Sequence, residues 1–159
     1  MSINKVLIAV DSGQHAEYAA RFGLDMARAY KADVGLVSIV EPIIYPSSGA
    51  DTITGIPIEN AHADEGEMLK IQTESAENTM QQVIKKFGGD LQVTYFTEYG
   101  LTADGILKCA NEYGADLIVV GTHNRTGLDR LLMGSVAEHV VRHSHVPVLV
   151  VPMKESESQ

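Results

Sequence analysis

The chain has 159 residues with a formal net charge of −9, and 45% of its residues are apolar. This length and apolar content suit one domain with a buried core, and they exclude an intrinsically disordered chain. The acidity argues against non-specific nucleic-acid binding and against docking on anionic lipid, because both need a basic surface.

The single cysteine and the hydropathy pattern indicate a cytoplasmic protein. Cys109 has no second cysteine with which to form an intrachain disulfide, and its place in a predicted helix favours a buried, inert thiol. The first apolar run is interrupted at Asp11, too soon for a signal peptide. No apolar stretch approaches the roughly 20 residues that a membrane span needs.

Apolar runs and helical spacings alternate along the chain. Continuous apolar runs are typical of strands buried on both faces of a sheet, and apolar residues three and four apart are typical of helices. Gly88-Gly89 and Gly114 are expected to end two of the helices. In chain order the pattern predicts a strand over 6–10, a helix over 14–30, a strand over 34–40, a helix over 63–87, a strand over 91–97, a helix over 102–113, a strand over 117–120, a helix over 135–143 and a strand over 146–151.

Two of these elements have a distinctive pattern. The strand over 91–97 alternates apolar and polar residues, which is typical of an edge strand. The long helix over 63–87 has an apolar stripe that we expect to face inward. Its members are Met68, Leu69, Ile71, Ala76, Met80, Val83, Ile84 and Phe87.

This order of elements predicts an α/β fold with a parallel five-stranded sheet, right-handed crossovers and helices on both faces. The first and fourth strands are the most apolar and should be central, and the alternating third strand should lie at an edge. A strand order of 3-2-1-4-5 meets both conditions. We expect one domain over 1–153 and a frayed polar tail over 154–159.

The segment 41–62 shows no clear periodicity. A connection this long is usually functional or disordered, and this one holds three prolines and several isoleucines. It is either a flap that packs on the domain or a plain surface loop.

The last predicted strand suggests a dimer. It is apolar on both faces and yet lies at an edge of the predicted sheet, where an uncovered strand would aggregate. A two-fold partner that pairs strand to strand along Val146–Val151 would cover it.

A ligand site is expected where the winding of the sheet reverses, outside the ends of the first and fourth strands. These strands end near Asp11 and Gly121. In the loop that follows, Asn124 tolerates the left-handed conformation, and Arg125 and Arg130 add positive charge. The loop leads to Gly134-Ser135 at a helix N-terminus, whose N–H groups and dipole attract anions. The sequence therefore predicts a phosphate-binding loop.

Other interpretations of the same residues stay open. Ser135 and Glu138 have the spacing of a capping box, which needs no ligand. His139 and His143 are four residues apart and can bind zinc, but no third ligand is evident, and helix histidines on a solvated face are commoner. The common hydrolase motifs and a general base are missing.

The loop resembles the Gly-x2-Gly-x9-Gly-Ser/Thr signature of the universal stress protein family, in its ATP-binding branch. Gly121, Gly134 and Ser135 match at the right spacing, and Asn124 stands where the second glycine belongs. The segments 9–11 and 143–148 are also similar to the family. The resemblance extends from Lys5 to Pro152.

The resemblance implies roles for individual residues. Asp11 would contact the adenosine end of ATP, Val40 would line the adenine pocket, and the residues around Gly134 would bind the phosphates. Mg²⁺ or Mn²⁺ is a possible companion of the nucleotide. The expected nucleotide-binding residues are Ala9, Val10, Asp11, Val40, Val120, Gly121, His123, Asn124, Arg125, Gly134, Ser135 and Val136.

The resemblance also implies a homodimer formed through the last strand. We therefore expect an ATP-binding stress-response regulator, in which nucleotide occupancy modulates contact with an unidentified protein partner. One alternative is a dimeric interaction protein of the same family that binds no nucleotide. The other is a nucleotide hydrolase, although without a general base it would be at most a slow ATPase.

Overall fold

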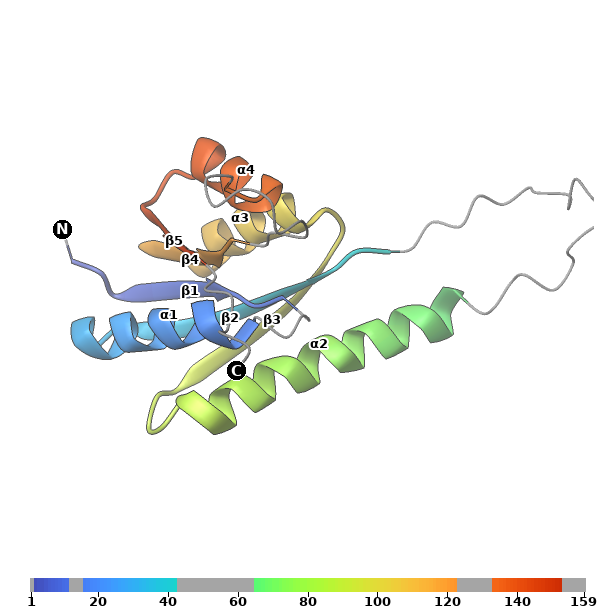
Figure 1. Ribbon diagram of the computed structural model, residues 1–159, viewed down its shortest axis with the longest axis horizontal. Helices are drawn as coiled ribbons and strands as arrows, with labels where there is room; N and C mark the ends of the chain where they lie inside the picture. Colours follow the sequence, from blue (N-terminus) through green and yellow to red (C-terminus); the bar gives the residue numbers. More distant parts are fainter. Residues whose placement is uncertain (1, 12–15, 43–64, 123–132, 153–159) are drawn as a thin grey trace, which may run out of the picture.

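Strands and helices alternate along the chain in the computed structural model, which describes residues 2–11, 16–42, 65–122 and 133–152 (Figure 1). The elements are β1 (Lys5–Ala9), α1 (Ala16–Tyr30), β2 (Asp33–Val40), α2 (Glu65–Phe87), β3 (Val93–Tyr99), α3 (Thr102–Tyr113), β4 (Leu117–Gly121), α4 (Ser135–His143) and β5 (Val148–Val151).

The five strands form a parallel sheet in the order β3-β2-β1-β4-β5, which confirms the predicted fold and strand order. Two apolar clusters form the core, one on each face of the sheet. Val6 and Ile8 of β1 belong to the cluster under α1 and α2, and Leu7 belongs to the cluster under α3 and α4. Figure 1 shows the same division, with α1 and α2 on one face and α3 and α4 on the other.

Glycines end the two helices where the sequence predicts it. Gly114 follows α3 in the left-handed conformation, with φ of 72°, and its N–H donates to the carbonyls of Ala110 and Asn111. Gly89 has φ of 55° just after α2. A residue with a Cβ adopts this conformation only with strain, so the sequence marks these ends clearly.

The last strand is shorter than predicted, because β5 begins at Val148 rather than Val146. A local turn precedes it, in which the Ser144 hydroxyl donates to the Val146 carbonyl (2.7 Å) and accepts from the Val146 N–H (3.1 Å). Pro147 has no N–H to contribute to a strand ladder. The strand therefore starts only after the proline.

The inward stripe of α2 is only partly as predicted. Ala76, Met80 and Val83 are buried, but Ile71 is 55% exposed. Thr73 is already level with the end of β3, where its hydroxyl lies 3.2 Å from that of Tyr99. Met68, Leu69 and Thr73 are half-buried although they lie in the same turns of α2. Ile71 is exposed because it lies about 140° around the helix from the buried Ala76, on the side that faces away from the sheet.

Several expectations fall outside the described residues. These are most of the segment predicted over 41–62, from residue 43 on, and the tail over 154–159. Within the described parts of the chain, no helix has the length and apolar character needed to cross a membrane.

Candidate functional site

The predicted site lies at the carboxyl edge of the sheet, where β1 and β4 end side by side. The register places Ile8 opposite Val119, so Ala9 and Gly121 end adjacent strands. In the sheet, β2 and β3 lie on one side of β1, and β4 and β5 lie on its other side. This is the reversal of winding at which open parallel sheets bind ligands.

Three valines of the predicted site form its floor. Val10, Val40 and Val120 are 2–4% exposed, and Val10 and Val120 belong to the two core clusters. Their side chains pack into the protein and hold the strand ends in place. Ala9 is half-buried and Asp11 is exposed, so the Asp11 carboxylate is one of the polar groups at this edge beside the floor.

The N-terminus of α4 is the other part of the site. Gly134 is its N-cap residue, with φ of −56° and ψ of 152°, and no hydrogen bond from a side chain is recorded at this cap among the described residues. The Gly134 carbonyl accepts the first helical hydrogen bond, from the Glu138 N–H (2.9 Å). The first N–H groups of a helix have no acceptor inside it, so the end of α4 can donate to an anion.

The capping-box interpretation of Ser135 is wrong. Ser135 is the first helical residue rather than the cap, and its side chain is exposed. The Glu138 carboxylate pairs with Arg142, one turn further along α4, at 2.7 Å. The serine hydroxyl is therefore not used to cap α4.

The middle of the predicted loop lies outside the described residues, so the positions of His123, Asn124 and Arg125 are not assigned. On either side of it, Gly121 and Gly134 are half-buried. Thr122 continues the ladder with β5, since its N–H donates to the Val151 carbonyl (3.0 Å).

Sequence reasoning missed a carboxylate at the neighbouring helix. Glu41, directly after β2, accepts from the N–H of Thr102 (3.0 Å) and from its hydroxyl (2.5 Å) at the start of α3. The two residues are 61 positions apart, and only the strand order brings them together. The available signal was an acidic residue at one strand end and a threonine opening a helix at the same edge.

The two histidines of α4 contact each other and the neighbouring helix α3. The His139 and His143 rings stack with centroids 4.1 Å apart, and the Nδ1 of His143 lies 2.9 Å from the His139 carbonyl. The Nε2 of His139 lies 3.1 Å from a carboxylate oxygen of Asp104 on α3. Across the described parts of the chain, no three ligating side chains are grouped as a metal would need.

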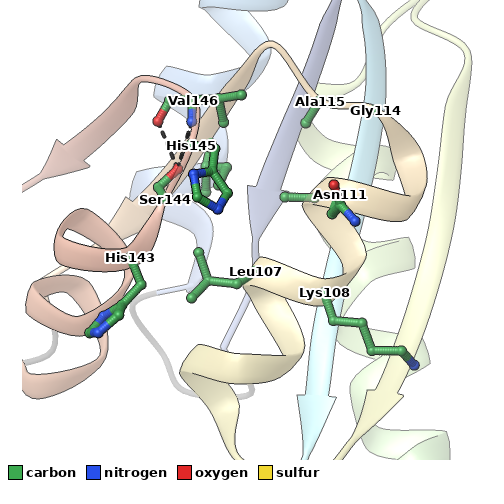
Figure 2. A pocket seen from close by; sticks show the side chains of 11 residues that line it. Leu107, Lys108, Asn111, Gly114, Ala115, His143, Ser144, His145 and Val146 are labelled. Carbon is green, nitrogen blue, oxygen red and sulfur yellow. Dashed lines mark hydrogen bonds between the residues drawn. The ribbon is translucent and has the colours of Figure 1, made fainter.

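A hollow of about 420 Å³ lies away from this edge, between α3 and the turn that joins α4 to β5 (Figure 2). Leu107, Ile118 and Val146 line it with apolar surface, and the Ser144 hydroxyl beside them is bonded to Val146. The Lys108 side chain extends away from His145 in Figure 2 and pairs with Glu98 at 2.9 Å. The Ser144 hydroxyl and the Lys108 ammonium are thus already bonded within the protein.

Burial is the main cause of the raised pKa values of Cys109 and Tyr113 on α3. Burial, followed by the charges of Glu98 and Glu112, raises the pKa of the Cys109 thiol to about 12. Burial and the charge of Asp33 raise the pKa of Tyr113 to about 12. A thiolate is therefore scarcely populated near neutral pH, which agrees with the expected inert cysteine.

Comparison with known proteins agrees with this architecture. Residues 2–152 match the model of the Universal stress protein family. Universal stress protein MJ0531 of Methanocaldococcus jannaschii is 31% identical over 153 residues, which cover 95% of this chain and 84% of that protein. Universal stress protein MJ0577 of the same organism is 30% identical over 156 residues, which cover 96% of each.

Two solved structures show the same fold. That of MJ0577 has a TM-score of 0.72 at 28% identity, and the match covers 98% of this chain and 100% of that one. A universal stress protein from Archaeoglobus fulgidus, solved in complex with dAMP, has a TM-score of 0.61 at 21% identity, with 95% and 99% covered. At that identity the second likeness shows the fold alone.

Proposed function

The chain belongs to the universal stress protein family, and from this premise we propose that it is a regulatory protein that binds ATP at the carboxyl edge of its sheet. Occupancy by the nucleotide would then modulate contact with a protein partner. The A. fulgidus relative bound to dAMP supports an adenine nucleotide as the class of ligand.

The N-terminus of α4 is the observation that carries this proposal. Gly134 brings no side chain to the helix end, and Ser135 follows it with an exposed hydroxyl that does not cap the helix. This donor set fits phosphate oxygens, which accept hydrogen bonds from helical N–H groups and hydroxyls. Gly134, Ser135 and Val136 would hold the phosphates.

The other end of the site suits a nucleoside. The buried Val40 side chain would be the floor on which adenine lies, and Asp11 would accept from a ribose hydroxyl. Gly121 and Asn124 would lie along the ribose and the phosphates, as the family signature implies. His123 and Arg125 of the same loop would contact the phosphates. Mg²⁺ or Mn²⁺ would accompany the phosphates as their counter-ion.

The first test is mass spectrometry of the small molecules released from freshly purified protein. We expect adenine nucleotide from the wild type and much less from Gly134→Val, whose side chain would occupy the phosphate end. The φ of −56° at Gly134 suits any residue, so this variant should keep the wild-type circular dichroism spectrum. Nucleotide released equally from both proteins would contradict the assigned site.

We also propose that the chain is a homodimer paired along β5, which occupies Val148–Val151 of the predicted segment Val146–Val151. β5 is an edge strand, and its aliphatic side chains Val148, Leu149 and Val150 are only half-buried in the single chain. Ile118 donates to the Pro147 carbonyl and Thr122 to the Val151 carbonyl, so odd-numbered residues of β5 face β4. The even-numbered backbone groups of Val148 and Val150 therefore face outward, toward a partner.

Val150→Pro tests this dimer because it removes an outward N–H and leaves the hydrogen bonds to β4 in place. Sedimentation velocity should show a dimer for the wild type and a monomer for the variant, with unchanged circular dichroism. A wild-type monomer at micromolar concentration would contradict the dimer. A Val150→Pro dimer would contradict this interface.

A further inference from the structure

The first turn of α3 is attached to the strand that carries the proposed adenine floor. The carboxylate of Glu41, directly after Val40, holds both the N–H and the hydroxyl of Thr102. The Gly100 N–H donates to the Val40 carbonyl at 3.1 Å. These contacts fix the start of α3 beside the end of β2.

The same turn of α3 lies directly on β2. At Gly105 an added Cβ would come within 2.8 Å of the Ile39 side chain, so the helix backbone approaches the strand as closely as its atoms allow. Gly105 and Ile106 are buried there. The position of this turn is thus set by packing as well as by the Glu41 carboxylate.

The first turn of α3 is also attached to the helix that carries the proposed phosphate end. The Nε2 of His139 lies 3.1 Å from Asp104. A neutral imidazole with its proton on Nε2 donates to this carboxylate, and a protonated one adds an ion pair. His139 is one turn along α4 from Ser135. This contact therefore acts on the turn of α4 next to the proposed phosphate end.

We propose that the first turn of α3 is a spacer that sets the distance between the adenine and phosphate ends of the nucleotide site, with Asp104 and His139 as positioning residues. The inference rests on the proposed nucleotide site. ATP must contact both ends at once, whereas adenosine reaches only the first. The Asp104–His139 contact should therefore contribute to the affinity for ATP and leave the affinity for adenosine unchanged.

Asp104→Ala separates this role from simple electrostatics. Loss of a negative charge near the phosphates would by itself strengthen ATP binding, whereas loss of the contact would let α4 shift and weaken it. Both side chains are partly exposed, at 44% for His139 and 62% for Asp104, so the expected effect is modest. We expect ATP binding to weaken about twofold to fivefold, as for an exposed ion pair.

The experiment is titration calorimetry with ATP and with adenosine on the full chain. Asp104→Ala, His139→Ala and the double variant should each weaken ATP binding by a similar factor, because each removes the same contact. Asp104→Asn keeps an acceptor for His139, so its affinity for ATP should equal that of the wild type. Glu112→Ala is the matched control, since Glu112 is on the same helix and 60% exposed.

The outcomes separate this inference from the proposed function. If the wild type binds ATP and Asp104→Ala binds it equally or more tightly, the spacer is refuted and the nucleotide site stands. Equal weakening of ATP and adenosine would also refute the spacer, because it would indicate general loosening of the fold. A wild type that binds neither ligand overturns both proposals.

Discussion

The N-termini of α3 and α4 occupy equivalent places in the fold but are completed in different ways. Both helices follow a parallel strand, start at the carboxyl edge and pack over the same core cluster. At α3, Glu41 supplies a carboxylate to the helix end. At α4 the cap residue is Gly134, and no side-chain cap is recorded in the described part of the chain.

The difference shows that the N–H groups at a helix N-terminus on this edge can already be bonded to a side chain of the protein. A carboxylate at a helix N-terminus stabilises a protein by about 0.5–2 kcal/mol, through the hydrogen bond and the helix dipole. Glu41 provides this stabilisation at α3. No described side chain provides it at α4. An incoming phosphate would supply at α4 what Glu41 supplies at α3.

Gly134→Asp should have the largest effect, because it makes α4 resemble α3. The φ and ψ of Gly134 suit an N-cap aspartate, whose carboxylate would hydrogen-bond the N–H groups proposed for the phosphates. We expect ATP affinity to fall at least tenfold and the melting temperature to rise by about 1–2 °C. Calorimetry and thermal melting measure the two effects. Undiminished ATP binding would contradict the role of this helix end.

Glu41→Ala should have the opposite effect on stability, because it makes α3 resemble α4. Loss of the carboxylate leaves the Thr102 N–H without its partner, and the free energy of unfolding should fall by about 1 kcal/mol. For a chain of this size the melting temperature would fall by about 2–4 °C. Glu41→Gln keeps an acceptor for the Thr102 N–H, so its melting temperature should fall by less. A melting temperature equal to that of the wild type would show that this cap contributes nothing.

Ser135→Ala should have the smallest effect, confined to the ligand. The hydroxyl does not cap the helix, so the melting temperature without ligand should stay within about 1 °C of the wild type. ATP affinity should fall about threefold to tenfold, as for the loss of one hydrogen bond that contributes about 1 kcal/mol. Ser75→Ala, at an exposed serine of α2, is the matched control. A drop in melting temperature with unchanged ATP binding would revive the capping role of Ser135.

The fold was predictable because its signals are local. The continuous apolar runs identify β1 and β4 as central strands, and the glycines after α2 and α3 mark where those helices end. The predicted strand order also depended on the alternating pattern of β3, which placed that strand at an edge. The alternative capping-box interpretation placed the N-cap of α4 one residue too late, because Ser135 and Gly134 both suit a cap and only the backbone conformation decides between them.

The contacts around the candidate site were less predictable because they join distant parts of the chain. Glu41 and Thr102 meet only when β2 and β3 pair in register, with Val40 opposite Tyr99. Asp104 meets His139 only when α3 and α4 pack side by side. Ile71 did not belong in the inward stripe of α2, because it lies about 140° around the helix from the buried Ala76.

Titration calorimetry of the wild-type chain with ATP, with and without Mg²⁺, tests the central claim most directly. The proposed site predicts one ATP bound per chain, with an affinity that Gly134→Asp lowers at least tenfold. A wild type that neither releases nor binds adenine nucleotide would contradict the claim. It would also favour a member of the family that acts through protein contacts alone.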